Sequence, residues 1–173
     1  PTGVSNEYRA RIESGNFLKY IYNNNVWTVT DKAGRTYTFG SGSTSRQDNP
    51  ADANQIYKWF IDSEKDTNNN AVSYSYFKDA GQIYPNIINY TKNGADNGIF
   101  SVVFERESRL DTLTSYQSRF AVKSNYRIKK IYTTVEGVTA RSYALAYSAG
   151  DNQKRSLLNS VTESGTEGAV TVT

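Results

Sequence analysis

Short segments in which large apolar or aromatic side chains alternate with small polar ones recur along this chain. The clearest example covers residues 71–77, where Val72, Tyr74 and Tyr76 alternate with serines. A period of two places alternate side chains on the same face of a β-strand. The pattern therefore predicts strands with one aromatic and one polar face. No segment predicts a helix longer than two turns, although residues 106–118 are the least strand-like and are a candidate for a helical turn.

Clusters of Asn, Asp and Gly separate these segments. Asn23–Asn25 lies between the strand-like residues 17–22 and 26–30, and Asp31–Gly34 lies between 26–30 and 35–39. Turn residues between two strand-like runs predict β-hairpins. About a dozen strands follow from this reading. The sequence predicts an all-β fold with an antiparallel, hairpin-connected sheet, either a curved open sheet or a β-sandwich, and little helix.

Three of the turns share a pattern in which Asp precedes Gly or Asn. An Asp side chain can accept hydrogen bonds from nearby backbone amides, and Gly and Asn tolerate the left-handed conformation of tight turns. The predicted hairpin-turn residues are Asp31, Gly34, Asp66, Asn69, Asp79 and Gly81.

The chain has 173 residues, including 14 Tyr, which suits one domain with much β-structure. We expect residues 1–173 to form a single β domain. Because the sequence opens at Pro1 without a Met, we also expect a fragment of a larger protein. Residues 40–55 are polar and offer few apolar side chains for burial, so they predict a flexible polar loop.

Two longer stretches carry a resemblance to a known group of proteins. Residues 59–76 read WFIDSEKDTNNNAVSYSY. They resemble the WxLxxxxDxNGNxIxYxY stretch of SpvB-like proteins and toxin-complex B subunits. Residues 27–40, WTVTDKAGRTYTFG, resemble the segment that precedes it, and their Asp-x-x-Gly-Arg turn is similar to the Rhs/YD repeat. The resemblance extends from about Arg9 to Gly165; Asn69 replaces the usual Gly, and the Rhs repeat array is missing.

The resemblance implies a non-catalytic structural role. In such toxins a β-sheet shell encloses or carries an effector, whose active site lies elsewhere in the parent chain. The expected partners are the rest of the parent polypeptide and other toxin-complex subunits. The expected location is secreted or at the cell surface.

The residue types available narrow the chemistry further. The chain has no His and no Cys, which excludes the commonest general base, a thiol nucleophile and most zinc sites. Asp66, Asn68 and Asn70 have the spacing of the start of a calcium loop, but the Gly at its sharp turn and its late Glu are missing. We therefore predict no enzymatic activity, no catalytic residue, no metal and no cofactor.

Charge and hydropathy disfavour a nucleic acid partner and a membrane span. The net charge is only +3, and in a strand Lys129 and Lys130 point to opposite faces, which disfavours a phosphate-binding stripe. No stretch approaches the about 20 apolar residues of a membrane helix. We predict no nucleic acid partner and no membrane span. The uncharged segment 169–173 predicts an edge strand open to self-association.

The aromatic residues leave one alternative function open. A flat aromatic face can stack against sugars, so the chain could instead be a carbohydrate-binding or adhesin module, whereas large aromatics more often pack inside a fold. The candidate ligand-stacking residues are Trp27, Tyr37, Trp59, Tyr74 and Tyr76.

Overall fold

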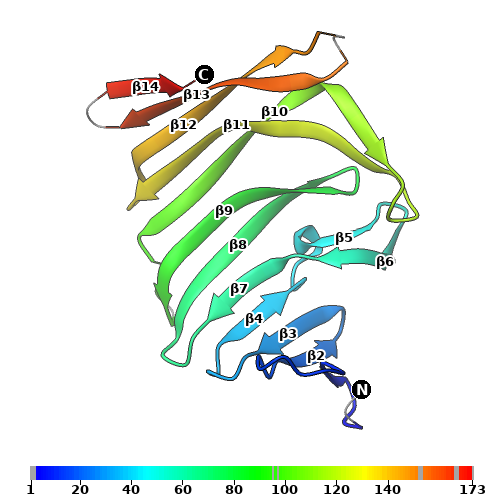
Figure 1. Cartoon of the computed structure of the whole chain (residues 1–173). Helices are drawn as coiled ribbons and strands as arrows, with labels where there is room; N and C mark the ends of the chain where they lie inside the picture. The colour runs from blue at the N-terminus through cyan, green and yellow to red at the C-terminus, as the bar shows by residue number, and fades with distance from the viewer. Residues whose placement is uncertain (1–2, 95, 97, 152–153, 166–167, 173) are drawn as a thin grey trace.

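The predicted all-β fold is confirmed. A computed structural model describes residues 3–94, 96, 98–151, 154–165 and 168–172, with only the backbone described for 168–172 (Figure 1). In these residues the regular elements are strands and one short 3₁₀ turn, η1. In chain order the elements are β1 (Glu7–Arg9), β2 (Lys19–Asn23), β3 (Val26–Thr30), β4 (Thr36–Phe39), η1 (Ser43–Ser45), β5 (Arg46–Asn49), β6 (Asp52–Trp59), β7 (Ile61–Lys65), β8 (Asn70–Asp79), β9 (Gln82–Asn93), β10 (Phe100–Ser115), β11 (Val122–Val135), β12 (Val138–Ala149), β13 (Ser156–Gly165) and β14 (Gly168–Val172).

Twelve strands form one antiparallel sheet in the order β1-β2-β3-β4-β7-β8-β9-β10-β11-β12-β13-β14. Each strand pairs with the next one along the chain, except that the hairpin β5–β6 is inserted between β4 and β7 as a separate two-stranded sheet. Figure 1 shows a curved single layer with β2 and β14 toward opposite ends and the β5–β6 hairpin beside its middle. Of the two predicted architectures, the fold is the curved open sheet.

The turns at Asp31 and Asp66 use the same local device. Asp31 Oδ1 accepts hydrogen bonds from the amides of Ala33 (2.9 Å) and Arg35 (3.0 Å), and Gly34 has a φ of +81°. Asp66 Oδ1 likewise accepts hydrogen bonds from the amides of residues 68 (2.8 Å) and 70 (2.9 Å), and Asn69 has a φ of +66°. Each turn places one residue in the left-handed region, which Gly and Asn adopt at low cost.

The turn after Asp79 is built differently. Asp79 pairs with Gln82 across a two-residue hairpin, in which Ala80 and Gly81 both have positive φ values of 45° and 80°. Two positive φ values are typical of the tight turn that matches the twist of a hairpin. The Asp79 side chain accepts a hydrogen bond from Asn125 Nδ2 at 2.7 Å instead of from its own turn. Asp79 therefore ties β8 to β11.

The prediction that residues 40–55 are a loop is wrong for most of the segment, which forms η1, β5 and the start of β6. Three of its polar side chains are buried, with exposed fractions of 1% for Ser45, 7% for Gln47 and 5% for Asp48. Gln47 Nε2 donates to the Gly81 carbonyl at 3.0 Å, and Asp48 forms an ion pair with Lys78. Buried polar groups that find partners can order a segment with few apolar residues. The flexibility of the segment stays a prediction.

The apolar core is small for a chain of this size. Among the described side chains, the buried hydrophobic ones are those of Val29, Ile83, Tyr84, Phe120 and Val122. The accessible surface is 11196 Å². A compact monomer of 19.4 kDa would expose about 8,500 Å². The excess is what a single-layer sheet produces, because much of both faces stays in contact with solvent.

Candidate functional site

Two tryptophans from separate hairpins meet on one face of the sheet. The rings of Trp27 on β3 and Trp59 on β6 lie 6.4 Å apart with an angle of 88° between their planes. Tyr22 contacts both rings, with centroid distances of 4.7 Å to Trp27 and 6.1 Å to Trp59. Trp59 Nε1 donates a hydrogen bond to the Asn25 carbonyl at 2.8 Å. The β5–β6 hairpin is thus attached to the turn between β2 and β3.

Register and one glycine bring these rings together. Trp27 lies opposite Tyr22 on β2 and opposite Phe39 on β4, so all three side chains share a face. Gly40 follows Phe39 with a φ of +72°, and a Cβ at this position would lie 2.3 Å from Trp59 Cδ1. Glycine is therefore required at position 40 both for its backbone conformation and for the space that the indole occupies.

Two open apolar hollows adjoin this cluster. The first, of about 390 Å³, is lined by Tyr20, Trp27, Val29, Phe39 and Trp59. The second, of about 490 Å³, shares Tyr20, Val29 and Phe39 with the first and is also lined by Tyr37. We call this surface the aromatic groove and define it by Tyr20, Trp27, Tyr37, Phe39 and Trp59.

The five predicted stacking residues do not gather at one point. Trp27, Trp59 and Tyr37 line the aromatic groove, whereas the Tyr76 ring packs against Phe60 with centroids 5.5 Å apart. Tyr76 also donates its hydroxyl hydrogen bond to the Ile61 carbonyl at 2.7 Å. The edge-to-face arrangement of the two indoles gives no common flat platform. A stacking role for these residues stays a prediction.

Burial dominates the electrostatics on this part of the sheet. It raises the pKa of Tyr76 to about 12, with a smaller contribution from the nearby Asp62 carboxylate. Burial also raises the pKa of Tyr74, with the Glu64 carboxylate acting in the same direction. A hydroxyl that resists ionisation in this way is a poor general base, so these tyrosines suit packing better than proton transfer.

Tyr20, Tyr22 and Phe39 belong to the groove or its aromatic cluster but were not among the predicted residues. The hairpin turn at Asn23–Asn25 was the available signal for two of them, because it places β2 directly against β3. In that register Tyr20 lies opposite Val29 and Tyr22 opposite Trp27. The position of Trp59 over the groove had no such local signal.

Asp66, Asn68 and Asn70, which have the spacing of the start of a calcium loop, form a hairpin turn. Both oxygens of Asp66 accept hydrogen bonds within its hairpin, including one from Asn70 Nδ2 to Oδ2 at 2.8 Å. The Asn70 side chain is also the largest cause of a lowered pKa at Asp66. Across the residues with assigned positions, no three His, Cys, Asp or Glu side chains come together as a metal site.

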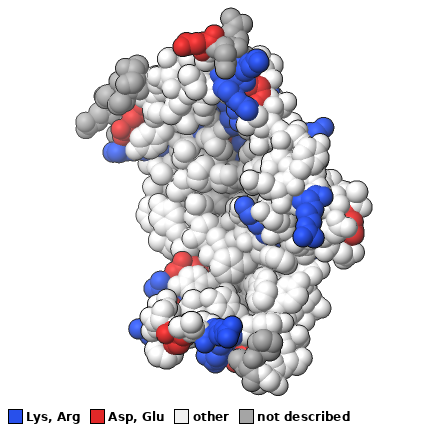
Figure 2. Space-filling view, turned by 45° about the vertical axis from the view of Figure 1, so that its right-hand side comes forward, with Lys and Arg blue, Asp and Glu red and all other residues white. Residues whose placement is uncertain are grey.

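Charged side chains do not gather into one patch on the face seen in Figure 2, where Lys and Arg are scattered and Asp and Glu lie among them. This distribution differs from the clustered basic face of a typical nucleic-acid-binding domain. The described part of the chain includes no helix long and apolar enough to cross a membrane.

Comparison with known proteins places this sheet in a family. The family model described as SpvB, Salmonella virulence plasmid 65kDa B protein, matches residues 4–99, more than half of the chain. No curated protein matches the sequence. The N-terminal domain of effector protein SpvB from Salmonella typhimurium strain LT2 is similar in fold, with a TM-score of 0.78, 15% identity, and coverage of 92% of this chain and 68% of that one.

Two larger toxin structures contain a similar fold. The crystal structure of TcdB2-TccC3 matches with a TM-score of 0.75 and 17% identity over 96% of this chain. The Photorhabdus luminescens Tc holotoxin pore matches with a TM-score of 0.74 and 17% identity, also over 96% of this chain. In both cases the match spans only 11% of the larger chain. The family match and the fold together show that this chain belongs to the SpvB family.

Proposed function

We propose that this chain is a non-catalytic, structural β-sheet segment of a large secreted protein of the Rhs and toxin-complex type, where it contributes to a shell that carries or encloses an effector. The observation that carries the proposal is the open, single-layer sheet of twelve strands. Its outer strands β1 and β14 each have one partner strand among the described residues. Unpaired strand edges are templates for further strands.

The uncovered faces of the sheet support the same role. The aromatic groove exposes apolar surface, and few apolar side chains are buried in the part of the chain that the structure describes. A large exposed apolar surface marks an interaction site, and a neighbouring polypeptide is one kind of partner that covers such a surface. A sheet with this surface suits a wall that packs against further chain better than a domain that works alone.

The relatives support a place within a larger assembly. The match to 11% of the TcdB2-TccC3 chain suggests that this fold is one part of a much longer polypeptide. We propose that the partners are the rest of the parent polypeptide and other toxin-complex subunits, and that the protein acts outside the cell that makes it. The absence of His and Cys from the sequence fits a role without catalysis.

Hydrogen–deuterium exchange at the sheet edges tests this proposal. In the isolated chain, the outward-facing amides of β1 and β14 should exchange quickly because solvent reaches them. In the larger parent protein the same amides should be protected, because neighbouring strands then accept their hydrogen bonds. The amides of β8, which lies between β7 and β9, are the internal control and should be protected in both samples. Equally fast exchange of both edges in the parent protein would contradict a continuous shell.

A further inference from the structure

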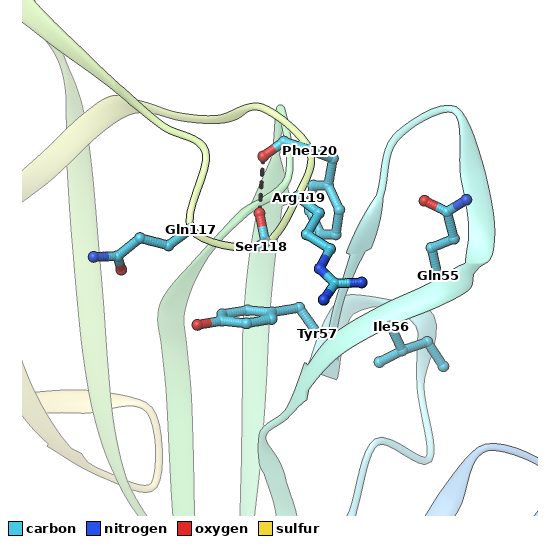
Figure 3. Close-up of a pocket in the computed structure, with 7 residues that line it drawn as sticks. All are labelled: Gln55, Ile56, Tyr57, Gln117, Ser118, Arg119 and Phe120. Carbon is cyan, nitrogen blue, oxygen red and sulfur yellow. Dashed lines mark hydrogen bonds between the residues drawn. The ribbon is translucent and has the colours of Figure 1, made fainter.

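A second cavity lies away from the aromatic groove, between β6 and the loop that joins β10 to β11 (Figure 3). Its volume is about 420 Å³. Two hairpins far apart in the sequence form its walls. The lining residues are Gln55, Ile56, Tyr57, Gln117, Ser118, Arg119 and Phe120.

The β10–β11 loop holds Arg119 in an unusual conformation. Its φ is +68°, in the left-handed region that costs a residue with a long side chain about 1–2 kcal/mol. Its amide donates to the Tyr116 carbonyl at 3.0 Å, and the buried Ser118 hydroxyl donates to the Phe120 carbonyl at 2.8 Å. The neighbouring amide of Lys123 donates to the Ala80 carbonyl at 3.0 Å. The loop is therefore fastened to the sheet, and the Arg119 side chain is exposed at its tip.

The Arg119 guanidinium extends toward Tyr57 and Ile56 across the cavity in Figure 3. Among the contacts that the structure describes, this guanidinium makes no hydrogen bond and no ion pair. Within the described part of the chain, it is the one charged residue that lines the cavity. The Arg119 side chain is exposed and stays hydrated, so the strain lies in the left-handed backbone alone, and such strain tends to occur at binding sites.

A smaller hollow of about 190 Å³ continues the cavity on the other side of Tyr57 and Gln117. Lys58 lines this hollow, and no Asp or Glu lines either one among the described residues. The two hollows form a groove that carries two positive charges. Side-chain amides and hydroxyls supply the rest of its polar lining, together with a few apolar residues.

We propose that this groove binds an acidic peptide segment of a partner polypeptide, with a carboxylate held by Arg119. An arginine side chain can donate two parallel hydrogen bonds to one carboxylate, and Lys58 adds a second positive charge nearby. The side-chain amide of Gln117 has both donors and an acceptor, which matches the peptide groups of an extended chain. Gln55 Oε1 already accepts a hydrogen bond from Asn49 Nδ2 at 2.8 Å, so Gln55 offers its Nε2 as a donor. The inference goes beyond the proposed structural role, which requires no ligand in this groove.

The surroundings of the Tyr57 ring favour a peptide over an acidic sugar as the occupant of the groove. Lys58 Nζ lies 5.2 Å from the centre of this ring. A stacked sugar would need a free aromatic face, and the ammonium group occupies space over one of the two faces of this ring. A peptide needs no such platform, because its recognition here depends on the carboxylate and the amides.

Fluorescence anisotropy with the full 173-residue chain tests the proposal. The probe is an end-capped, labelled peptide of alternating glutamate and serine, and its counterpart with glutamine in place of glutamate tests the need for charge. Arg119→Gly removes the guanidinium, and Gly adopts the left-handed backbone without strain, so the fold should be retained. Lys129→Gln removes one exposed positive charge outside the groove and is the matched control. Circular dichroism verifies the fold of each variant.

The glutamate peptide should bind, and Arg119→Gly should weaken this binding about tenfold or more, as expected for the loss of a charged hydrogen bond. Lys58→Gln should weaken it to a smaller extent. Lys129→Gln should leave it unchanged, and the glutamine peptide should not bind. No binding of the glutamate peptide, an equal loss in Lys129→Gln, or binding that Arg119→Gly leaves intact would overturn the proposal. Tighter binding of oligogalacturonate or inorganic phosphate than of the peptide would overturn the assignment to a peptide.

Discussion

Arg109 holds Asp111 through two parallel hydrogen bonds, from Nε to Oδ1 at 2.9 Å and from Nη2 to Oδ2 at 2.7 Å. Asp111 Oδ2 also accepts hydrogen bonds from the amide (2.7 Å) and hydroxyl (2.9 Å) of Ser156, the first residue of β13. The pairing of β10 with β11 is interrupted between Ser108 and Leu113. Figure 1 shows β10 changing direction where it passes the start of β13. The three side chains thus fix the bend of β10 against the turn between β12 and β13.

This contact predicts a pH-dependent stability. The hydrogen bonds from Arg109, and then those from Ser156, hold the pKa of Asp111 well below its ordinary value. A carboxylate with a lowered pKa in the folded state contributes stability above its unfolded pKa of about 3.9, and this contribution is lost as the pH falls below it. Asp111→Asn should lower the melting temperature near neutral pH. Between about pH 5 and about pH 2, its melting temperature should fall less than that of the original chain.

Glu136→Gln is the matched control for this experiment. Glu136 is an exposed carboxylate in the turn between β11 and β12, and no side-chain hydrogen bond is described for it. The substitution should leave both the melting temperature and its pH dependence close to those of the original chain. Parallel pH profiles for the original chain and Asp111→Asn would show that the carboxylate does not stabilise the bend.

Gly40→Ala should destabilise the sheet more than the same change at another left-handed glycine. A Cβ at position 40 would overlap Trp59, whereas a Cβ at Gly137, with a φ of +80°, meets nothing within 4 Å. Gly137→Ala should therefore cost about 1 kcal/mol for its backbone. Gly40→Ala should cost about 3 kcal/mol, because displacement of the indole adds to the backbone term. Urea unfolding measures both values, and a shift in tryptophan fluorescence should accompany only Gly40→Ala; equal costs would contradict the steric argument.

Tyr76 should be among the last tyrosines to ionise as the pH rises. Because burial raises its pKa to about 12, the folded state favours the neutral hydroxyl. The stability from this burial is complete below the unfolded pKa of about 10 and is lost as the pH rises toward 12. Absorbance at alkaline pH should show that Tyr76→Phe removes a high-pH step from the tyrosine titration. Loss of a step near pH 10 instead would indicate an exposed Tyr76 hydroxyl.

Removal of the last strand should weaken the free edge of the sheet. β14 pairs with β13 from Val161↔Val172 to Gly165↔Gly168. Thr173 is the last residue of the predicted edge segment 169–173 and lies outside the described residues. Deletion of residues 168–173 leaves the edge of β13 unpaired, which favours pairing with another chain. The melting temperature should fall, and light scattering should detect more self-association. If neither quantity changes, β14 does not protect this edge.

A glycan array separates the structural role from the carbohydrate-binding alternative. Since Trp27 and Trp59 pack edge to face, we expect no glycan signal that depends on Trp59. Trp59→Phe keeps an aromatic ring but loses the hydrogen bond to the Asn25 carbonyl, so it should lower stability by about 1 kcal/mol without a change on the array. A specific glycan signal that this substitution abolishes in a folded protein would favour the alternative.

The sequence alone determined the β-fold because its signals are local. Alternation over residues 71–77 predicts the faces of β8 whatever lies beside it, and the Asp31 and Asp66 turns depend on hydrogen bonds within five residues. Local geometry of this kind can be read from neighbouring residues. The family resemblance was equally accessible, since it rests on the order of strand and turn residues over 59–76.

The tertiary structure decided the parts that depend on distant partners. The segment 40–55 is ordered by polar groups whose partners lie far along the chain: Gln47 bonds to Gly81, and Asp48 pairs with Lys78. Residues 106–118 were the candidate for a helical turn, but residues 106–115 continue β10 through a bend that Ser156 holds at Asp111. A buried polar side chain carries no apolar period, and whether it stabilises or destabilises the fold depends on the partner that folding brings to it.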